Sequence, residues 1–254
     1  MSAVFSVAGL NKAFGGLTVA GDISLSLAAG DRVALIGPNG AGKTTFVNLV
    51  TGHLAPDSGR VALGGDDITG LGPTRRVRAG LVRTFQVTRL FDDMTPREHV
   101  ALAVLQRTGR GGRLVGAFEA MDDVAAEADA LLDSLGLAEV AGRPAGEIAY
   151  GQRRLLEIAL ALALKPRVLL LDEPAAGVPQ ADTPRIEAAL AGLPPELAVL
   201  MIEHDMDLVF RFARRVVVLA AGRIVFDGPP ADVAADARVR EAYLGNYAHG
   251  RGSA

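Results

Sequence analysis

The chain has 254 residues, half of them hydrophobic, and a formal net charge of −3 at pH 7. This length allows one large domain or two modest ones with a well-buried core. The small net charge argues against wholesale nucleic-acid binding, and the lack of cysteine excludes disulfides and thiolate metal sites. No apolar run reaches the length of a membrane-spanning helix, and the N-terminus lacks a secretory pattern, so we expect neither feature.

The first part of the chain predicts strands that lead to a glycine-rich loop. Alternating apolar residues predict strands over 2–9 and 22–27, and a continuous apolar run predicts a buried strand over 32–36. Alternating strands that precede buried ones predict a mixed sheet. Phe14 lies in a turn between the first two strands, where it could be either a core residue or a platform for a purine ring.

The loop after the third strand fits G-x-x-x-x-G-K-[ST], the pattern that cradles phosphate groups. It consists of Gly37, Pro38, Asn39, Gly40, Ala41, Gly42, Lys43, Thr44 and Thr45. Glycines let several backbone N–H groups point at one anion, and Lys43 can meet the outer phosphates. The Thr44 hydroxyl can ligate Mg²⁺. The alternative is a glycine turn that fits by chance, but a strand precedes the loop and a helical pattern follows it over 45–50.

Between this loop and residue 150 the pattern changes from mixed to helical. A short hairpin over 60–65, a helix over 73–80 and a strand over 81–85 come first. We interpret the basic run at 75–78 as a solvated helix face, with a contact to acidic lipid or a partner as the alternative. Helices are predicted over 96–107 and 119–135, with no strand evident, so residues 87–150 form a predicted helical subdomain.

The rest of the chain returns to alternating helices and strands. The predicted helices span 151–164, 183–192 and 206–213, and the predicted strands span 167–171, 198–202, 215–219 and 222–226, before two short C-terminal helices. Continuous apolar strands of this kind are typical of a parallel sheet. We therefore predict an α/β fold with a core of 1–86 and 151–254 and the inserted helical subdomain.

Polar residues follow several of these strands directly. In an open α/β sheet such strand ends are where ligands bind. Asp172 is placed to help hold Mg²⁺, and the adjacent Glu173 could orient the water that attacks a γ-phosphate. Gln86 could complete the metal shell or be an ordinary loop amide, and His204 could be a structural residue or a sensor of the γ-phosphate.

These motifs together resemble the nucleotide-binding subunits of ABC transporters over essentially the whole chain. Residues 37–45 look like Walker A, 168–173 like Walker B with its catalytic glutamate, 84–86 like the Q-loop and 203–205 like the switch histidine region. The resemblance implies a P-loop NTPase that uses ATP and Mg²⁺. It assigns catalysis to Glu173, His204 and Gln86, metal binding to Thr44, Gln86 and Asp172, and adenine stacking to Phe14.

The signature loop is expected at the head of the helix over 151–164. Its residues are Ala149, Tyr150, Gly151 and Gln152, and the family resemblance implies that they close over ATP held by a partner subunit. Ala149 replaces the usual serine, and Pro179 stands where the D-loop, which links the two ATP sites, usually has Asp or Asn. Because proline has no N–H to donate, communication between the sites is the function most exposed to this change.

Five short motifs are similar to the branched-chain amino acid importers, in particular to the longer of their two ATPases. They lie at 149–151, 156–159, 172–177, 202–206 and 241–245, and the segment 84–91 is similar as well. The resemblance implies an ATPase subunit on the cytoplasmic face of the membrane, paired with itself or a sister ATPase. Its other partners are transmembrane permease subunits and, indirectly, an extracellular or periplasmic binding protein.

Other functions remain open from the sequence. Urea and short-amide importers share much of this pattern, so the cargo follows from family resemblance only. A non-transport ABC ATPase usually carries a second cassette or a long coiled coil, which this chain lacks. A regulatory module that binds nucleotide without turnover is a further alternative, which the changed signature and D-loop keep in view.

Overall fold

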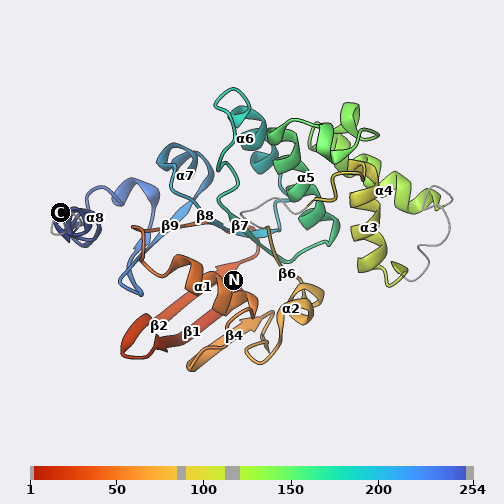
Figure 1. Ribbon diagram of the computed structural model, residues 1–254. Coiled ribbons are helices and arrows are strands. Elements are labelled where there is room, and N and C mark those ends of the chain that lie inside the picture. Colours follow the sequence, from red (N-terminus) through yellow and green to blue (C-terminus); the bar gives the residue numbers. More distant parts are fainter. Residues whose placement is uncertain (1–2, 85–89, 112–120, 250–254) are drawn as a thin grey trace. The chain divides into compact units, whose positions relative to one another are not determined.

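The computed structural model describes residues 3–84, 90–111 and 121–249, and Figure 1 shows their helices and strands. The strands are β1 Ala3–Phe14, β2 Leu17–Ala28, β3 Arg32–Ile36, β4 Ser58–Leu63, β5 Asp66–Asp67, β6 Leu81–Arg83, β7 Val168–Asp172, β8 Ala198–Ile202, β9 Arg215–Ala220 and β10 Arg223–Gly228. The helices are α1 Lys43–Thr51, α2 Pro73–Ala79, α3 Pro96–Arg107, α4 Asp122–Ser134, α5 Tyr150–Ala163, α6 Thr183–Ala191, α7 Met206–Phe212 and α8 Ala237–His249, with short 3-10 turns at Ala138–Val140, Ala145–Glu147 and Pro230–Asp232.

The strands form two sheets. One has four strands in the order β2-β1-β4-β5, and the other has six in the order β10-β9-β3-β8-β7-β6. In the second sheet β3 pairs in parallel with both β8 and β9, while β10 is antiparallel to β9. That sheet is mixed, as predicted, but the early strands form an antiparallel sheet of their own.

The first two strands are longer than their sequence pattern predicts. The β1–β2 ladder has register shifts between Val7 and Leu10, between Leu10 and Lys12, and between Lys12 and Ala13. Each shift interrupts the alternation of inward and outward residues, so the periodicity that marks a strand ends too early. For this reason the sequence pattern does not predict a strand over residues 10–14 or 17–21, although both belong to β1 and β2.

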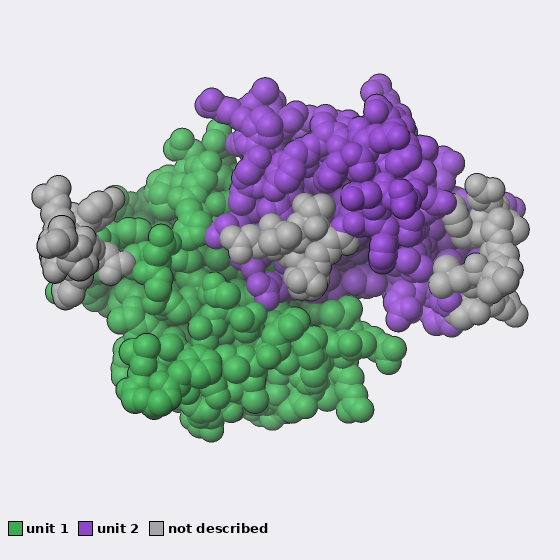
Figure 2. Space-filling model, viewed as in Figure 1, with its two compact units in different colours: residues 1–81, 167–171, 195–254 green, residues 82–166, 172–194 purple. Residues whose placement is uncertain are grey.

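The chain divides into two compact units, which are coloured separately in Figure 2. The first unit holds residues 1–81, 167–171 and 195–254, and the second holds 82–166 and 172–194. Their bounds differ from those of the predicted helical subdomain, because α5 and the segment 172–194, which contains α6, group with the preceding helices. Between residues 90 and 150, the described part of the chain consists of helices and 3-10 turns joined by loops.

The core of the first unit lies around α1. Buried apolar side chains of this helix, such as Phe46 and Leu49, pack with residues from both sheets, including Phe5 of β1 and Val33 of β3. Burying side chains of this size stabilises the folded state by about 1.5–3 kcal/mol each relative to exposure. The helix that follows the glycine-rich loop is therefore fixed by the main core of its unit.

One basic residue predicted to lie on a solvated helix face is buried instead. Arg76 in α2 is 1% exposed, whereas Arg75 and Arg78 are exposed as predicted. Its guanidinium donates to the carbonyls of Leu49 and Val50 in the last turn of α1, at 2.8 and 2.7 Å. The prediction of a solvated face for 75–78 is wrong at Arg76. It treats a charged residue as facing water, but the last carbonyls of a helix need hydrogen-bond donors, and Arg76 supplies them.

Among the residues described, no helix is both long enough and apolar enough to cross a membrane.

Candidate functional site

The glycine-rich loop connects β3 to α1 and is tightly surrounded by backbone. Gly42 has φ 101°, and a Cβ atom added there would lie 2.6 Å from the carbonyl oxygen of Val19. A Cβ added at Gly37 would lie 2.1 Å from the carbonyl oxygen of Leu219. Real side chains do not fit at such distances, so these two positions require glycine for steric reasons. The loop conformation follows from its packing against β2 and β9.

Lys43 at the start of α1 turns back onto the loop. Its side chain is buried, and its ammonium group donates to the carbonyl oxygens of Gly37 at 2.6 Å and Pro38 at 3.1 Å. A buried ammonium group needs oxygen partners. The loop thus surrounds a positive charge at the N-terminus of a helix, which is the arrangement that attracts a phosphate group.

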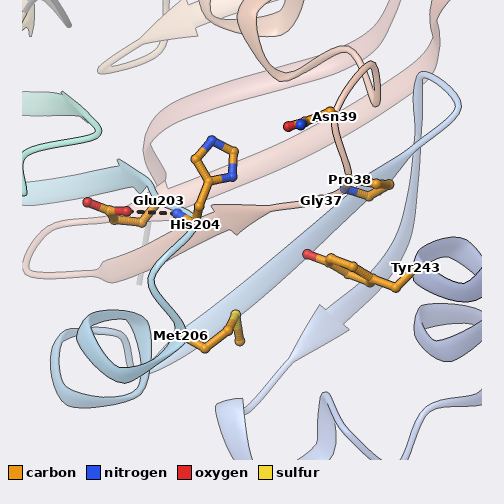
Figure 3. A pocket seen from close by; sticks show the side chains of 7 residues that line it. All are labelled: Gly37, Pro38, Asn39, Glu203, His204, Met206 and Tyr243. Carbon is orange, nitrogen blue, oxygen red and sulfur yellow. Dashed lines mark hydrogen bonds between the residues drawn. The ribbon is translucent and has the colours of Figure 1, made fainter. Parts of the chain in front are cut away.

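A pocket of 360 Å³ lies beside the first residues of this loop (Figure 3). It is lined by Gly37, Pro38, Asn39, Glu203, His204, Met206 and Tyr243. Glu203 is buried, and its carboxylate accepts the backbone N–H of His204 at 2.7 Å, which shapes the turn after β8. The exposed His204 side chain is thereby presented at the pocket, which is the position that a sensor of the γ-phosphate requires.

Tyr243 brings the C-terminal helix α8 to the same pocket. Figure 3 shows its ring extending toward Gly37 and Pro38. Burial raises the pKa of the Tyr243 hydroxyl, and a hydrogen bond with the Gly37 backbone acts in the opposite direction. The motif at 241–245 marks the resemblance to the importers but predicts no role for this tyrosine. Its position shows that α8 reaches the phosphate loop.

Phe14 at the end of β1 is 52% exposed, so it is not a core residue. The ammonium of Lys12 lies 5.6 Å from the centre of its ring. An exposed aromatic ring beside a cation can stack on another flat, electron-rich ring. Of the two sequence interpretations, only the platform for a purine ring is compatible with this exposure.

In the second unit, Asp172 forms an ion pair that the sequence did not indicate. Its carboxylate accepts from the Arg83 guanidinium at 2.6 Å, and both side chains are largely buried. The backbone N–H of Asp172 also donates to the hydroxyl of Thr84 at 3.2 Å. A partly buried carboxylate is costly without a cation, and here Arg83 supplies one.

Glu173, the next residue, has a φ of 50°, which is unusual for a residue with a side chain. Such a backbone costs of the order of 1–3 kcal/mol and persists only where the surroundings hold it in place. Residues held in this way cluster at active sites and switch segments, although Asp22, Lys165 and Ala221 of this chain also have positive φ. The strain supports a functional position for Glu173.

The predicted signature loop forms the head of α5, also in the second unit. Ala149 precedes the helix, and its N–H donates to the side chain of Gln152 at 3.0 Å. Gln152 therefore caps its own helix, a role that the sequence did not reveal. Gln86 lies outside the described residues. The predicted site residues thus group by unit, with the phosphate loop, Phe14 and His204 in the first and Asp172, Glu173 and the signature loop in the second.

Two family models match the chain. The model of the ABC transporter family covers residues 20–176, and a model described as the branched-chain amino acid ATP-binding cassette transporter covers residues 223–249. The first match includes the phosphate loop and the strand that ends at Asp172. The second includes β10 and α8, from which Tyr243 reaches that loop.

Curated relatives match over nearly the whole chain. The chain is 40% identical to the high-affinity branched-chain amino acid transport ATP-binding protein BraF of Pseudomonas aeruginosa, over 95% of this chain and 98% of the relative. It is 38% identical, with the same coverage, to LivG of Escherichia coli, whose description is otherwise the same.

A solved structure titled as the ADP conformation of MJ1267, an ATP-binding cassette of an ABC transporter, is similar with a TM-score of 0.82 and 29% identity. The alignment covers 96% of this chain and all of the solved one. A nucleotide-free cassette from an ABC transporter matches with a TM-score of 0.81. The predicted P-loop NTPase fold is confirmed by these likenesses.

Proposed function

Because the chain belongs to the ABC transporter family of ATP-binding proteins, we propose that it hydrolyses ATP to drive the uptake of branched-chain amino acids through a membrane permease. The observation that carries the ATPase role is the phosphate loop, in which the buried Lys43 ammonium lies among loop carbonyls at the start of α1. The C-terminal family match at 223–249 and the relatives' printed cargo support the choice of solute.

The residues present fit ATP and Mg²⁺. The loop forms a cradle that Cβ atoms at Gly37 and Gly42 would fill. The Thr44 hydroxyl of the loop and the Asp172 carboxylate at the end of β7 are oxygen ligands of the type that Mg²⁺ prefers. We propose that these two residues hold the metal together with Gln86. Bound Mg²⁺ would neutralise charge that develops on the phosphates.

The chain's own groups would then act as follows. Loop N–H groups and Lys43 bind and orient the phosphates, with the Lys43 ammonium exchanging loop carbonyls for phosphate oxygens. Phe14 stacks on the adenine ring. Glu173 orients the attacking water, and His204 contacts the γ-phosphate from the pocket beside the loop. Positioning and charge neutralisation account for most of the catalysis of phosphoryl transfer.

The partners follow from the same proposal. A second ATPase subunit, either another copy or a sister chain, would place its own phosphate loop against the signature loop Ala149–Gln152. Transmembrane permease subunits would bind the helical part of the second unit, at the cytoplasmic face of the membrane, and a binding protein would deliver the solute to them.

Uptake of radiolabelled leucine, urea and a short-chain amide tests this function in cells with wild-type, Lys43→Ala or Glu173→Gln protein. We expect both variants to abolish leucine uptake and to leave the other two solutes unchanged. Loss of urea or amide uptake instead would keep the ATPase role and change the cargo. Unchanged uptake of all three would contradict a transport function.

A further inference from the structure

Within the second unit, the signature loop is in direct contact with the segment that carries the catalytic glutamate, residues 173–182, here called the glutamate segment. The Tyr150 hydroxyl donates to the carbonyl oxygen of Ala176 at 3.2 Å. Next to it, a Cβ added at Gly177 would lie 3.1 Å from the same hydroxyl. The tyrosine therefore lies directly against the chain three and four residues after Glu173.

Arg154, one turn further along α5, supports this contact. It is 3% exposed, and its guanidinium lies 5.7 Å from the centre of the Tyr150 ring. One of its nitrogens also approaches the carbonyl oxygen of Ala176 at 3.4 Å, and another binds Glu157 at 2.8 Å. A buried guanidinium anchored by a carboxylate gives the tyrosine a fixed surface on which to rest.

A second contact lies at the far end of the glutamate segment. A Cβ added at Gly151 would lie 3.0 Å from the Cβ of Asp182, the residue just before α6. The head of α5 thus touches the glutamate segment on both sides of Pro179. Two contacts of this kind fix both the distance and the orientation of one element on the other.

We propose that Tyr150, supported by Arg154, is a positioning residue for Glu173 of its own chain. This inference rests on the proposed function, in which the same signature loop closes over ATP held by the partner subunit. Because Glu173 has a strained backbone with φ 50°, it needs its neighbours to be held, and the Tyr150 hydroxyl holds Ala176 and Gly177. When the signature loop closes on the ATP held by the partner subunit, it thereby changes the position of Glu173, which acts on the ATP held by its own chain.

The contact also gives a reason for tyrosine in this signature loop. Pro179 removes a backbone donor from the D-loop, where the family links its two ATP sites. The Tyr150 contact lies between Glu173 and Pro179 and provides a link through a side chain. Communication between the sites then does not depend on the missing N–H group.

Two half-active transporters test this role. In the first, the partner ATPase carries glutamine in place of its catalytic glutamate, so turnover depends on Glu173 of this chain. In the second, this chain carries Glu173→Gln, so turnover depends on the partner. Tyr150→Phe is introduced into this chain in both. It removes only the hydroxyl from a side chain that is 41% exposed, so the protein should fold.

We expect Tyr150→Phe to lower kcat about five-fold in the first transporter, the size of one lost neutral hydrogen bond, with KM for ATP unchanged. In the second transporter, whose active ATP is closed over by this chain's signature loop, the fall in kcat should be smaller than in the first. Ser134→Ala is the matched control, because its hydroxyl also donates to a backbone carbonyl of the second unit, that of Leu131 at 2.7 Å. Ser134→Ala should leave kcat unchanged in both transporters.

Other outcomes would overturn the inference. A loss confined to the second transporter, or equal losses in both, would show that Tyr150 serves the partner's nucleotide, and no loss in either would show that its hydroxyl positions nothing. If the first transporter fails to hydrolyse ATP before any change at Tyr150, the catalytic role of Glu173 is wrong, and the inference falls with it.

Hydrogen exchange gives a reading that is independent of turnover. The N–H of Ala176 donates to the carbonyl of Glu173 at 3.0 Å, and the N–H of Val178 donates to that of Ala175 at 3.1 Å. In Tyr150→Phe these two amides should exchange about five-fold faster, while the melting temperature of the chain stays unchanged. Unchanged exchange would contradict a holding role for the hydroxyl.

Discussion

The phosphate loop of the first unit and the glutamate segment of the second are held in different ways. The loop is enclosed by backbone atoms, since carbonyl oxygens of β2 and β9 approach it more closely than any side chain would allow. The glutamate segment and the residue just before it are held by side chains, since the Arg83 guanidinium binds the Asp172 carboxylate and the Tyr150 hydroxyl donates to the Ala176 carbonyl oxygen. One site element is thus fixed by main-chain packing, and the other by a few polar contacts.

This difference fits the work proposed for each element. A cradle for phosphate gains from being preformed, because nothing then has to be ordered when the nucleotide binds. A segment that must respond to a second nucleotide has to move, and contacts of about 1 kcal/mol each can be broken and remade. The comparison predicts large effects of substitution in the first unit and smaller ones in the second.

The largest effect is expected at Gly42. Gly42→Ala places a methyl group 2.6 Å from a backbone oxygen at a φ of 101°, so the free energy of unfolding should fall by about 3–4 kcal/mol and ATP binding should be lost. Gly40→Ala is the matched control in the same loop, with φ 78° and open space around it, and should cost only about 1 kcal/mol. Urea unfolding measures both, and equal costs would contradict main-chain packing as the cause.

Arg76 should come next. Arg76→Met leaves the carbonyls of Leu49 and Val50 buried without this donor, so the free energy of unfolding should fall by about 3 kcal/mol. The exposed Arg75 offers a control, and Arg75→Met should change stability by less than about 0.5 kcal/mol. Similar values for the two in urea unfolding would show that the buried guanidinium carries no stability.

Arg83 tests the second unit. Arg83→Met leaves the carboxylate of Asp172 without its cation, and we expect a loss of about 2 kcal/mol in the free energy of unfolding. The pair of Arg97 and Asp129 in the same unit has the same 2.6 Å separation but both side chains are nearly half exposed. Arg97→Met should therefore lower the free energy of unfolding by no more than about 1 kcal/mol. Urea unfolding of both variants measures the two losses. A larger loss for Arg97→Met would contradict burial as the source of the difference.

The smallest effect concerns pH. Hydrogen bonds from Arg107, aided by Lys165, lower the pKa of Glu127 from 4.5 to about 2. A lowered carboxyl pKa stabilises the folded state above pH 4.5, and this contribution is lost as the pH falls toward 2. Glu127→Gln should thus cost about 1 kcal/mol at pH 7, after allowance for solvent exposure, and little near pH 2.5.

Melting temperatures of the two proteins between pH 7 and pH 2.5 measure that difference. A gap that stays constant across this range would show that the charge of Glu127 does not contribute.

The sequence predicted most of the first unit's part of the site because that part depends on local pattern. The phosphate loop is one continuous stretch between an apolar strand and an amphipathic helix, and its glycines report the required backbone directly. Strands such as β3 and β8 were predicted at their observed bounds, because buried parallel strands are continuous apolar runs. The extra length of β1 and β2 was missed because bulges break the alternating pattern.

The contacts that join distant residues could not be read in this way. Arg83 and Asp172 are 89 positions apart, and Tyr150 and Ala176 are 26 apart. Nothing in the local sequence of either residue names its partner. The burial of Arg76 was missed for a related reason, since its partners are backbone carbonyls, which every residue possesses. One local signal does indicate a site residue. Tyr243 lies in the C-terminal motif at 241–245, and the structure places it at the pocket beside the phosphate loop.

Arg76 has a consequence at the opposite end of α1. The aligned peptide dipoles of this helix place partial positive charge at its N-terminus, beside Lys43, and partial negative charge at its last carbonyls. The Arg76 guanidinium, bound to the carbonyls of Leu49 and Val50, compensates the partial negative charge at that end. A phosphate bound at the N-terminus of α1 is therefore repelled less by the C-terminal end of the helix. Because Arg76 is shielded from solvent, dissolved salt screens this compensation far less than it screens exposed ion pairs. Phosphate affinity of the loop should accordingly retain this contribution in concentrated salt.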